Sequence, residues 1–249
     1  MKKRSLILST ALLLVAIMAC TSATYAWFTN NTTASVTTIT ASVDAASSLL
    51  ISGAAAVPAV GSDAWKSTIG QADLETLNGT QLLDRSSVNA SNFYSKSVNP
   101  ATNEATFAAS GDTGIITFKL HFISSAGGDL VVTNETFTSL LGATKAARVA
   151  MICDGTTIIW EPDNTAGTIV NDGYKTTAVD AINDVEGNTA AQMTTISEFT
   201  DADVLTHLDP SVAKTLTVKI WLEGQDAECA NAITGDVAIT TSFQFGLAA

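Results

Sequence analysis

The side chains that most often carry chemistry are few in this chain and follow no familiar catalytic pattern. The two histidines are His121, beside Lys119 on the polar side of an expected strand, and His207, within the acidic stretch 201–209. A histidine near a carboxylate can act as a general base or a metal ligand. However, the chain contains no H-E-x-x-H zinc motif, no G-x-S-x-G elbow and no phosphate-binding glycine loop. The sequence therefore predicts no catalytic residues and a protein that is not an enzyme. His207 is expected to be a solvated loop histidine.

Clustered carboxylates are the second candidate for a site, because calcium prefers carboxylate oxygens. The candidate groups are 180–186, which holds four acidic or amide side chains, and the pair Asp201 and Asp203. Neither group has the spacing of an EF-hand loop. We therefore expect an acidic surface without a cofactor, with calcium binding as the alternative.

Cysteine chemistry is limited to Cys153 and Cys229 once Cys20 is assigned to the N-terminal segment. In an exported chain these two residues can form one disulfide bond, and the alternative is two separate thiols. A zinc site would need more ligands than two cysteines, and the only two histidines lie elsewhere in the chain, so zinc binding is a weak alternative.

The N-terminal segment indicates export. A basic stretch, Met1–Arg4, precedes an almost unbroken apolar run at 6–19 and then small residues up to Ala26. This order is typical of a secretory signal peptide, and the apolar run is shorter than the roughly 20 residues that span a membrane. We expect cleavage between Ala26 and Trp27. The alternatives are a lipoprotein processed before Cys20 and a retained membrane anchor.

Charge and length constrain what the rest of the chain can do. Three of the 12 Lys and Arg residues lie in the first four positions and none of the 24 acidic residues precedes Trp27, so residues 27–249 carry a formal charge of −15. That charge argues against nucleic acid and anionic membranes as partners. No second segment is long and apolar enough to span a membrane, so we expect a secreted chain without a stable span after processing. We predict a signal peptide at 1–26 and one domain at 27–249.

A period of two dominates this domain and predicts strands. In the segment 27–52, one apolar side of an extended arm is formed by Ile39, Ala41, Val43, Ala45, Leu49 and Ile51. Alternation returns at 116–122, 216–222 and 237–247, and Asp154-Gly155 predicts a tight hairpin turn between 148–152 and 157–160. The segment 53–112 is more polar and is expected to be a long insertion, with a short helix within 62–83. The predicted fold is an all-β antiparallel sandwich, resembling a jelly roll, with loop and helix insertions.

Three stretches carry a resemblance to a known family. Thr24–Asn30 resembles the junction of signal peptides cleaved by the SipW-type peptidase of Gram-positive bacteria, and Trp221–Cys229 resembles a tryptophan-glutamate-glycine stretch near the C-terminus of such exported proteins. The hairpin that begins with Ala147–Met151 is similar as well. Together they resemble the TasA/camelysin family. The resemblance does not cover 53–112 or 171–209.

The resemblance implies a jelly-roll domain that assembles into fibres of an extracellular biofilm matrix. It also implies a metallopeptidase label for camelysin-type members, but no matching metal motif is present. We therefore expect a structural homopolymer, with other matrix proteins as further partners, formed head-to-tail by strand addition of the arm. The arm residues that fill the neighbour's groove would be Val36, Ile39, Ala41 and Val43.

Two alternatives differ in kind from the fibre subunit. One is a cell-surface adhesin or carbohydrate-binding module, with Trp65, Trp160 and Trp221 as candidate stacking residues. Trp221 shares the polar parity of its strand, so it lies either on an open face or beneath the insertion. The other alternative is a secreted metallopeptidase.

Overall fold

The computed structural model divides the chain into two units, Met1–Thr32 and Thr33–Ala249, and only the second contains residues whose structure is described. The described residues are 34–44, 48–79, 81–87, 89–99, 104–139, 146–162, 195–196, 198–224, 229 and 237–248. The predicted cleavage point at Ala26 and Trp27 and the acidic segment 180–186 lie outside them.

The described part of the chain is built almost wholly of strands. The elements are β1 (Ala34–Val43), β2 (Leu49–Ser52), β3 (Thr68–Gly70), the 3₁₀ turn η1 (Gln71–Asp73), β4 (Gln81–Leu82), β5 (Asp84–Arg85), β6 (Tyr94–Asn99), β7 (Glu104–Ala109), β8 (Ile116–Ser124), β9 (Gly128–Ser139), β10 (Ala147–Cys153), β11 (Thr156–Trp160), β12 (Thr195–Ile196), β13 (Thr206–Leu208), β14 (Lys214–Glu223) and β15 (Val237–Leu247). The all-β prediction is therefore confirmed.

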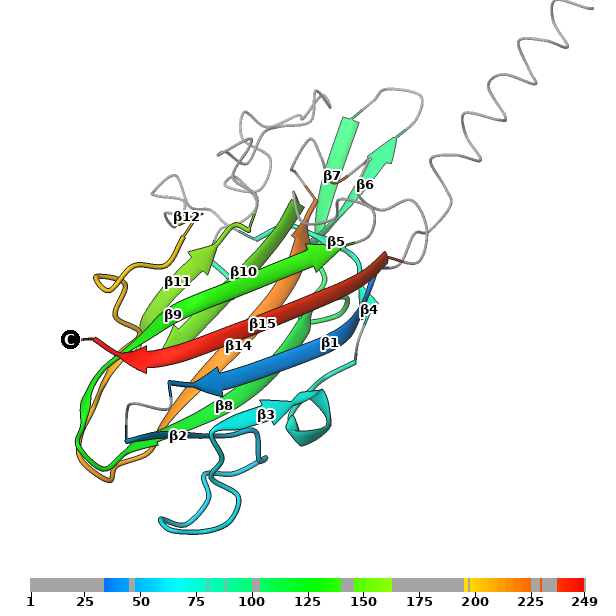
Figure 1. Ribbon diagram of the computed structural model, residues 1–249. Helices are drawn as coiled ribbons and strands as arrows, with labels where there is room; N and C mark the ends of the chain where they lie inside the picture. The colour runs from blue at the N-terminus through cyan, green and yellow to red at the C-terminus, as the bar shows by residue number, and fades with distance from the viewer. Residues whose placement is uncertain are drawn as a thin grey trace, which may run out of the picture. The chain divides into compact units, whose positions relative to one another are not determined.

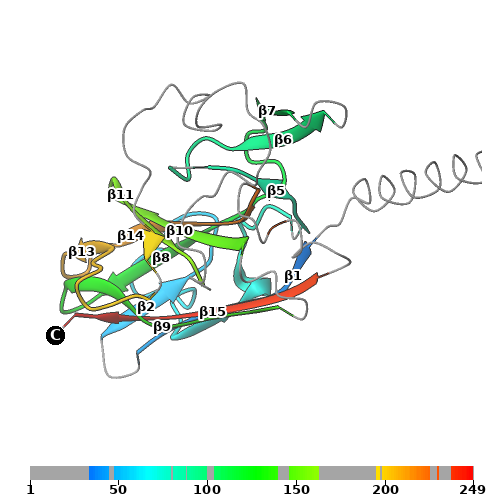
Figure 2. The same cartoon turned by 90° about the horizontal axis from the view of Figure 1, so that it is seen from above.

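Two packed sheets form the body of this unit (Figures 1 and 2). We name them sheet A, in the order β13-β9-β15-β1-β3 with β4 also beside β1, and sheet B, in the order β12-β11-β10-β14-β8-β2 with β5 beside β14. Most pairs are antiparallel, and the exceptions are β1 with β15, β11 with β12, and β14 with β5. The hairpin of β6 and β7 forms a third, two-stranded sheet.

The core lies between the two sheets because each strand presents one apolar side to the other sheet. Phe122 of sheet B meets Phe245 of sheet A with ring centroids 4.7 Å apart. The predicted alternation holds in β8 and β14, whose inward side chains are fully buried: Ile116, Phe118, Leu120, Phe122, Leu216, Val218, Ile220 and Leu222. The hairpin of β10 and β11 is also confirmed. Its turn residues, Asp154 and Gly155, both have positive φ angles, 48° and 83°, which a two-residue type I′ turn requires.

The expected single strand across 27–52 is instead two strands in different sheets. β1 pairs in sheet A, whereas β2 pairs with β8 in sheet B. The apolar residues of both strands still face the same core, since Ile39 and Val43 approach it from one side and Leu49 and Ile51 from the other. A shared parity is thus compatible with a crossover from one sheet to the other, which periodicity alone cannot detect.

The segment 53–112 is more integrated than an insertion between strands. Its residues form β3 and β4 against β1, β5 against β14, and the β6–β7 hairpin. The expected helix within 62–83 is replaced by β3 and η1, because Thr68–Gly70 pairs with Thr40–Ser42 of β1. Helical spacing of apolar residues was misleading here, since strand pairing with a distant partner decided the local structure.

Candidate functional site: the first strand and its neighbours

β1 is the element on which the sequence places the assembly residues. Its threonines, valines and isoleucine favour a pleated strand, and one side of it is apolar. All four predicted arm residues point into the core, with exposures of 2% for Val36, 1% for Ile39, 2% for Ala41 and 6% for Val43. They form part of the main core cluster between the sheets.

A β-bulge explains how Val36 shares the face of residues that have the opposite parity. The register with β15 shifts between Val36 and Thr38, so one extra residue is accommodated at Thr37. The Thr37 hydroxyl donates a hydrogen bond to the Ile239 carbonyl over 3.1 Å at this point. A strict period of two would have turned Val36 outward.

Two kinds of neighbour hold β1 in sheet A. On one side β15 pairs with it in parallel along its whole length, from Ala34 opposite Val237 to Val43 opposite Phe245. On the other side the neighbours are short, because β3 covers only Thr40–Ser42 and β4 only Ala34–Ser35. In Figure 1, β1 (blue) lies beside β15 (red) in the middle of the sheet.

β1 is joined to the rest of the described fold through a short connector. A tight turn cannot join two parallel strands, so paired parallel strands are separated by a longer stretch of chain. Here that stretch is long, since the bonded residues Thr37 and Ile239 are 202 residues apart in sequence. The connector, Asp44–Ser48, leads from the Val43 end of β1 to β2. Removing β1 therefore needs no other described strand to be threaded through a loop.

The two cysteines are buried thiols in the structure, and no disulfide joins Cys153 to Cys229. The Cys153 thiol donates to the Thr215 carbonyl over 3.3 Å, and burial raises the pKa of this thiol. Both cysteines belong to the main core cluster.

The two histidines have opposite surroundings. His121 lies on the polar, outer face of β8 as predicted, but it is buried beneath Ala54, whose carbonyl is 3.0 Å from its Nε2 atom. Its Nδ1 atom lies 2.8 Å from the Thr215 hydroxyl, and burial lowers its pKa. The His207 side chain, in contrast, is 64% exposed, and its Nδ1 atom lies 2.6 Å from the Asp129 carboxylate.

The acidic and metal candidates do not form a cluster within the described part of the chain. Asp203 accepts hydrogen bonds from the Thr200 backbone and hydroxyl groups, which makes it part of a local turn. Among the described residues, no three His, Cys, Asp or Glu side chains are placed to share a metal ion.

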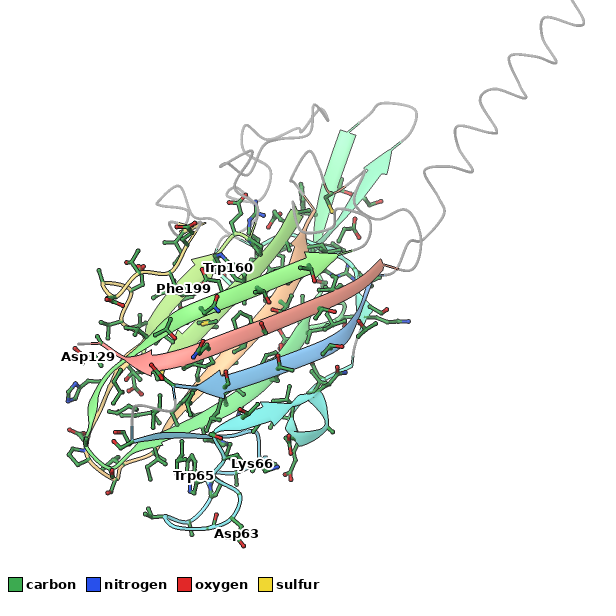
Figure 3. All side chains as sticks on the ribbon, viewed as in Figure 1. Asp63, Trp65, Lys66, Asp129, Trp160 and Phe199 are labelled. Atoms are coloured by element: carbon green, nitrogen blue, oxygen red, sulfur yellow. The ribbon has the colours of Figure 1, made fainter. Side chains whose placement is uncertain are left out.

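All three candidate stacking tryptophans are buried. Trp65, Trp160 and Trp221 are 8%, 4% and 1% exposed. Trp160 lies in an aromatic cluster with Phe199, whose ring centroid is 6.1 Å away (Figure 3). Trp221 lies beneath the segment 53–112, as one of the two alternatives held, and its ring and that of Phe93 form a T-shaped pair with centroids 5.4 Å apart.

A buried polar layer on the outer face of sheet B was not predicted. Arg148 and Glu161 form an ion pair at 3.0 Å, with side chains only 3% and 2% exposed. Nearby, Glu223 accepts hydrogen bonds from the Trp221 indole and the Ser87 backbone, each at 3.2 Å. The sequence did contain one indication of this layer, because the outward positions of two neighbouring strands carry charges of both signs.

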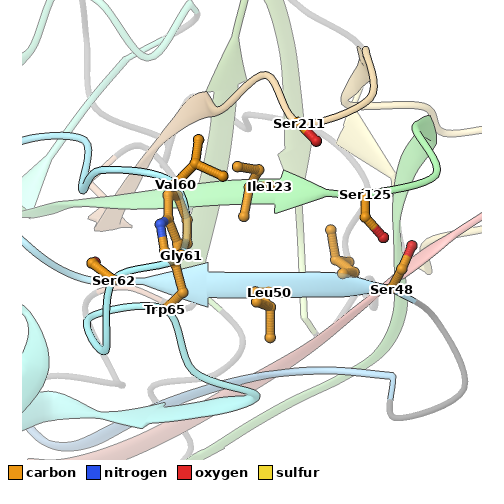
Figure 4. A pocket seen from close by; sticks show the side chains of 10 residues that line it. Ser48, Leu50, Val60, Gly61, Ser62, Trp65, Ile123, Ser125 and Ser211 are labelled. Atoms are coloured by element: carbon orange, nitrogen blue, oxygen red, sulfur yellow. The ribbon is translucent and has the colours of Figure 1, made fainter.

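An open pocket of about 460 Å³ lies on the outer face of sheet B beside β2 (Figure 4). Its apolar wall is formed by Leu50, Val60, Trp65 and Ile123, and its rim carries the hydroxyls of Ser48, Ser62, Ser125 and Ser211. Leu50 and Ile123 are opposite each other in the pairing of β2 with β8. No charged residue lines the pocket.

The fold and the sites described above define an all-β sandwich in which the first strand is bonded to the last. No family model, curated protein or solved structure gave a match to this chain. Among the described residues, no helix has the length and apolar character needed to cross a membrane.

Proposed function

We propose that the protein is a secreted structural subunit that assembles with copies of itself by exchanging β1. In this assembly, the β1 strand of one subunit leaves its own sheet A and takes the place of β1 in a neighbour, between β15 and the β3–β4 side. The observation that carries the proposal is that the first described strand, buried along one side, is held by pairing with a chain segment about 200 residues away.

The energetics favour exchange over simple loss of the strand. Withdrawing β1 uncovers Val36, Ile39 and Val43, and burial of each such side chain is worth about 1.5–3 kcal/mol. It also leaves the edge of β15 without its partner, and an unpaired strand edge recruits another strand. A neighbour's β1 restores the same contacts, because the sequences are identical.

Secretion and processing supply the order of events. The N-terminal segment is expected to be a signal peptide cut between Ala26 and Trp27, which would hold the arm at the membrane until export. Assembly would then begin outside the cell, as the resemblance to biofilm-matrix proteins implies. Carbohydrate binding through Trp65, Trp160 or Trp221 has less support, since all three side chains are buried.

Mixing of two variants that each carry one added cysteine tests the exchange directly, since the native Cys153 and Cys229 are buried. Thr38 and Thr240 are exposed and opposite each other across the β1–β15 pair, and adjacent strands bring such residues within disulfide range. Thr38→Cys and Thr240→Cys proteins, incubated together and then oxidised, are expected to give a mixed disulfide dimer. Neither variant alone contains the pair.

Thr138→Cys mixed with Thr240→Cys is the matched control. These two residues are also opposite each other, but they lie in β9 and β15, which remain in one subunit. Mixed dimers from both mixtures would indicate random surface oxidation. A lack of mixed dimers from Thr38→Cys and Thr240→Cys, over the concentrations at which fibres form, would refute exchange of β1.

A further inference from the structure

Strand exchange alone does not favour an assembly over the closed monomer. An exchanged β1 makes the same contacts in a neighbouring subunit as it makes in its own subunit. The connector also keeps β1 at an effective concentration on the order of millimolar near its own sheet, which favours the closed monomer. A stable assembly therefore needs a second contact that the monomer lacks. This requirement rests on the proposed function.

The length of the connector determines where that second contact must be. Asp44–Ser48 spans at most about 21 Å between Val43 and Leu49 when fully extended. After exchange, Val43 lies beside Phe245 of the accepting subunit, while Leu49 remains beside Ser124 of the donor. The two subunits must therefore meet at the end of the sandwich that carries the connector.

Three exposed apolar side chains of the described residues lie at this same end. They are Leu50, Val60 and Val212, whose exposures are 39%, 68% and 47%. Leu50 and Val60 line the pocket in Figure 4, Val212 follows Ser211 of its rim, and the last connector residue, Ser48, is also part of that rim. We name these three residues the Leu50 patch.

The charge distribution also suits a second copy as the occupant. Residues 27–249 carry a formal charge of −15, so two copies repel each other over most of their surfaces. The pocket has no charged lining, which allows two acidic molecules to approach there without opposing carboxylates. Clustered exposed apolar side chains are typical of protein contact sites.

From the connector length, the clustering and the charge, we infer that the Leu50 patch is the second subunit contact and is covered by another copy of this chain when β1 exchanges. Val60 is the most exposed residue of the patch, at 68%, and makes the best probe, because its high exposure in the monomer means that replacing it leaves the fold intact.

The test is the mixed-disulfide assay with Val60→Asp added to both the Thr38→Cys and the Thr240→Cys protein. A buried charge opposite an apolar contact should lower the yield of mixed dimers and fibres roughly tenfold or more. The thermal midpoint of the monomer should stay unchanged. Ala108→Asp, which adds the same charge at an exposed position of β7, should leave the yield as it was.

Each outcome has one meaning. No mixed dimer from the parent pair refutes strand exchange and, with it, this contact. Mixed dimers that form equally well with Val60→Asp refute the contact alone. Binding of cellohexaose or chitohexaose to the monomer, lost on Val60→Asp without any change in exchange, would reassign the pocket to saccharide and overturn the inference.

Discussion

Ile39→Ala in β1 tests whether the first strand can open without unfolding the whole sandwich. Ile39 is 1% exposed and packs in the core between the sheets. The substitution removes three carbon atoms, which costs about 2.4 kcal/mol in transfer free energy. Adding the cavity left in the core gives a loss of about 3 kcal/mol, equivalent to an equilibrium shift of about 150-fold.

Hydrogen exchange measured by NMR is the appropriate assay, because it resolves local openings from global ones. We expect the amides of β1 to exchange faster than those of β8 and β14 in the wild-type protein. Ile39→Ala should accelerate β1 exchange by about 150-fold if opening precedes exchange in a fast equilibrium.

Ile220→Ala provides the comparison that makes the test decisive. Ile220 is a fully buried isoleucine in β14, in the middle of sheet B. Its loss should accelerate the amides of sheet B, which open only by global unfolding, and leave β1 nearly unchanged. Equal acceleration of amide exchange in β1 and in sheet B by Ile220→Ala would mean that β1 opens only by global unfolding. The proposed strand exchange requires local opening of β1, so this result would contradict it.

Three further predictions concern sheet B. Because burial lowers the pKa of His121, the folded state disfavours its protonated form; the free energy of unfolding should therefore fall as the pH drops below about 6.5, and urea titrations of His121→Gln should show a shallower decline. Phe93→Ala should uncover Trp221, shift its fluorescence to the red and cost about 3 kcal/mol in chemical denaturation; an unshifted spectrum would mean that other groups cover the indole. Arg148→Ala should cost about 3–5 kcal/mol, since it removes the cation beside buried Glu161, whereas replacing both residues by apolar ones should recover much of that loss; equal stability of the single and double variants would contradict this reasoning.

The sequence predicted the structure best in strands that have one buried face and one exposed face. In β8, β14 and β15 the alternation is regular, and the structure follows it. The turn at Asp154-Gly155 was also predictable, because few residue pairs accept two consecutive positive φ angles. These features depend on local chemistry, which a single sequence displays.

Features that depend on distant partners were predicted poorly. The crossover between β1 and β2, the bulge beside Val36 and the conversion of 62–83 from helix to strand all arise from pairing with residues far along the chain. Likewise, His121 was placed on the polar face of its strand, and nothing in that strand indicates that Ala54 covers it. Val36, Ile39, Ala41 and Val43 are buried along one side of β1, but the parallel alignment of this strand with β15 was not foreseen.

The way β1 is anchored also has a mechanical consequence. Its hydrogen bonds to β15 run across the strands, and the connector leaves β1 at one end, beyond Val43. Tension that reaches an exchanged strand through Asp44, along the strand axis, would load the whole row of bonds in shear, from Phe245 to Val237. Sideways peeling would instead break them one after another. A fibre made of such junctions would resist a force along its strands far better than a force perpendicular to them.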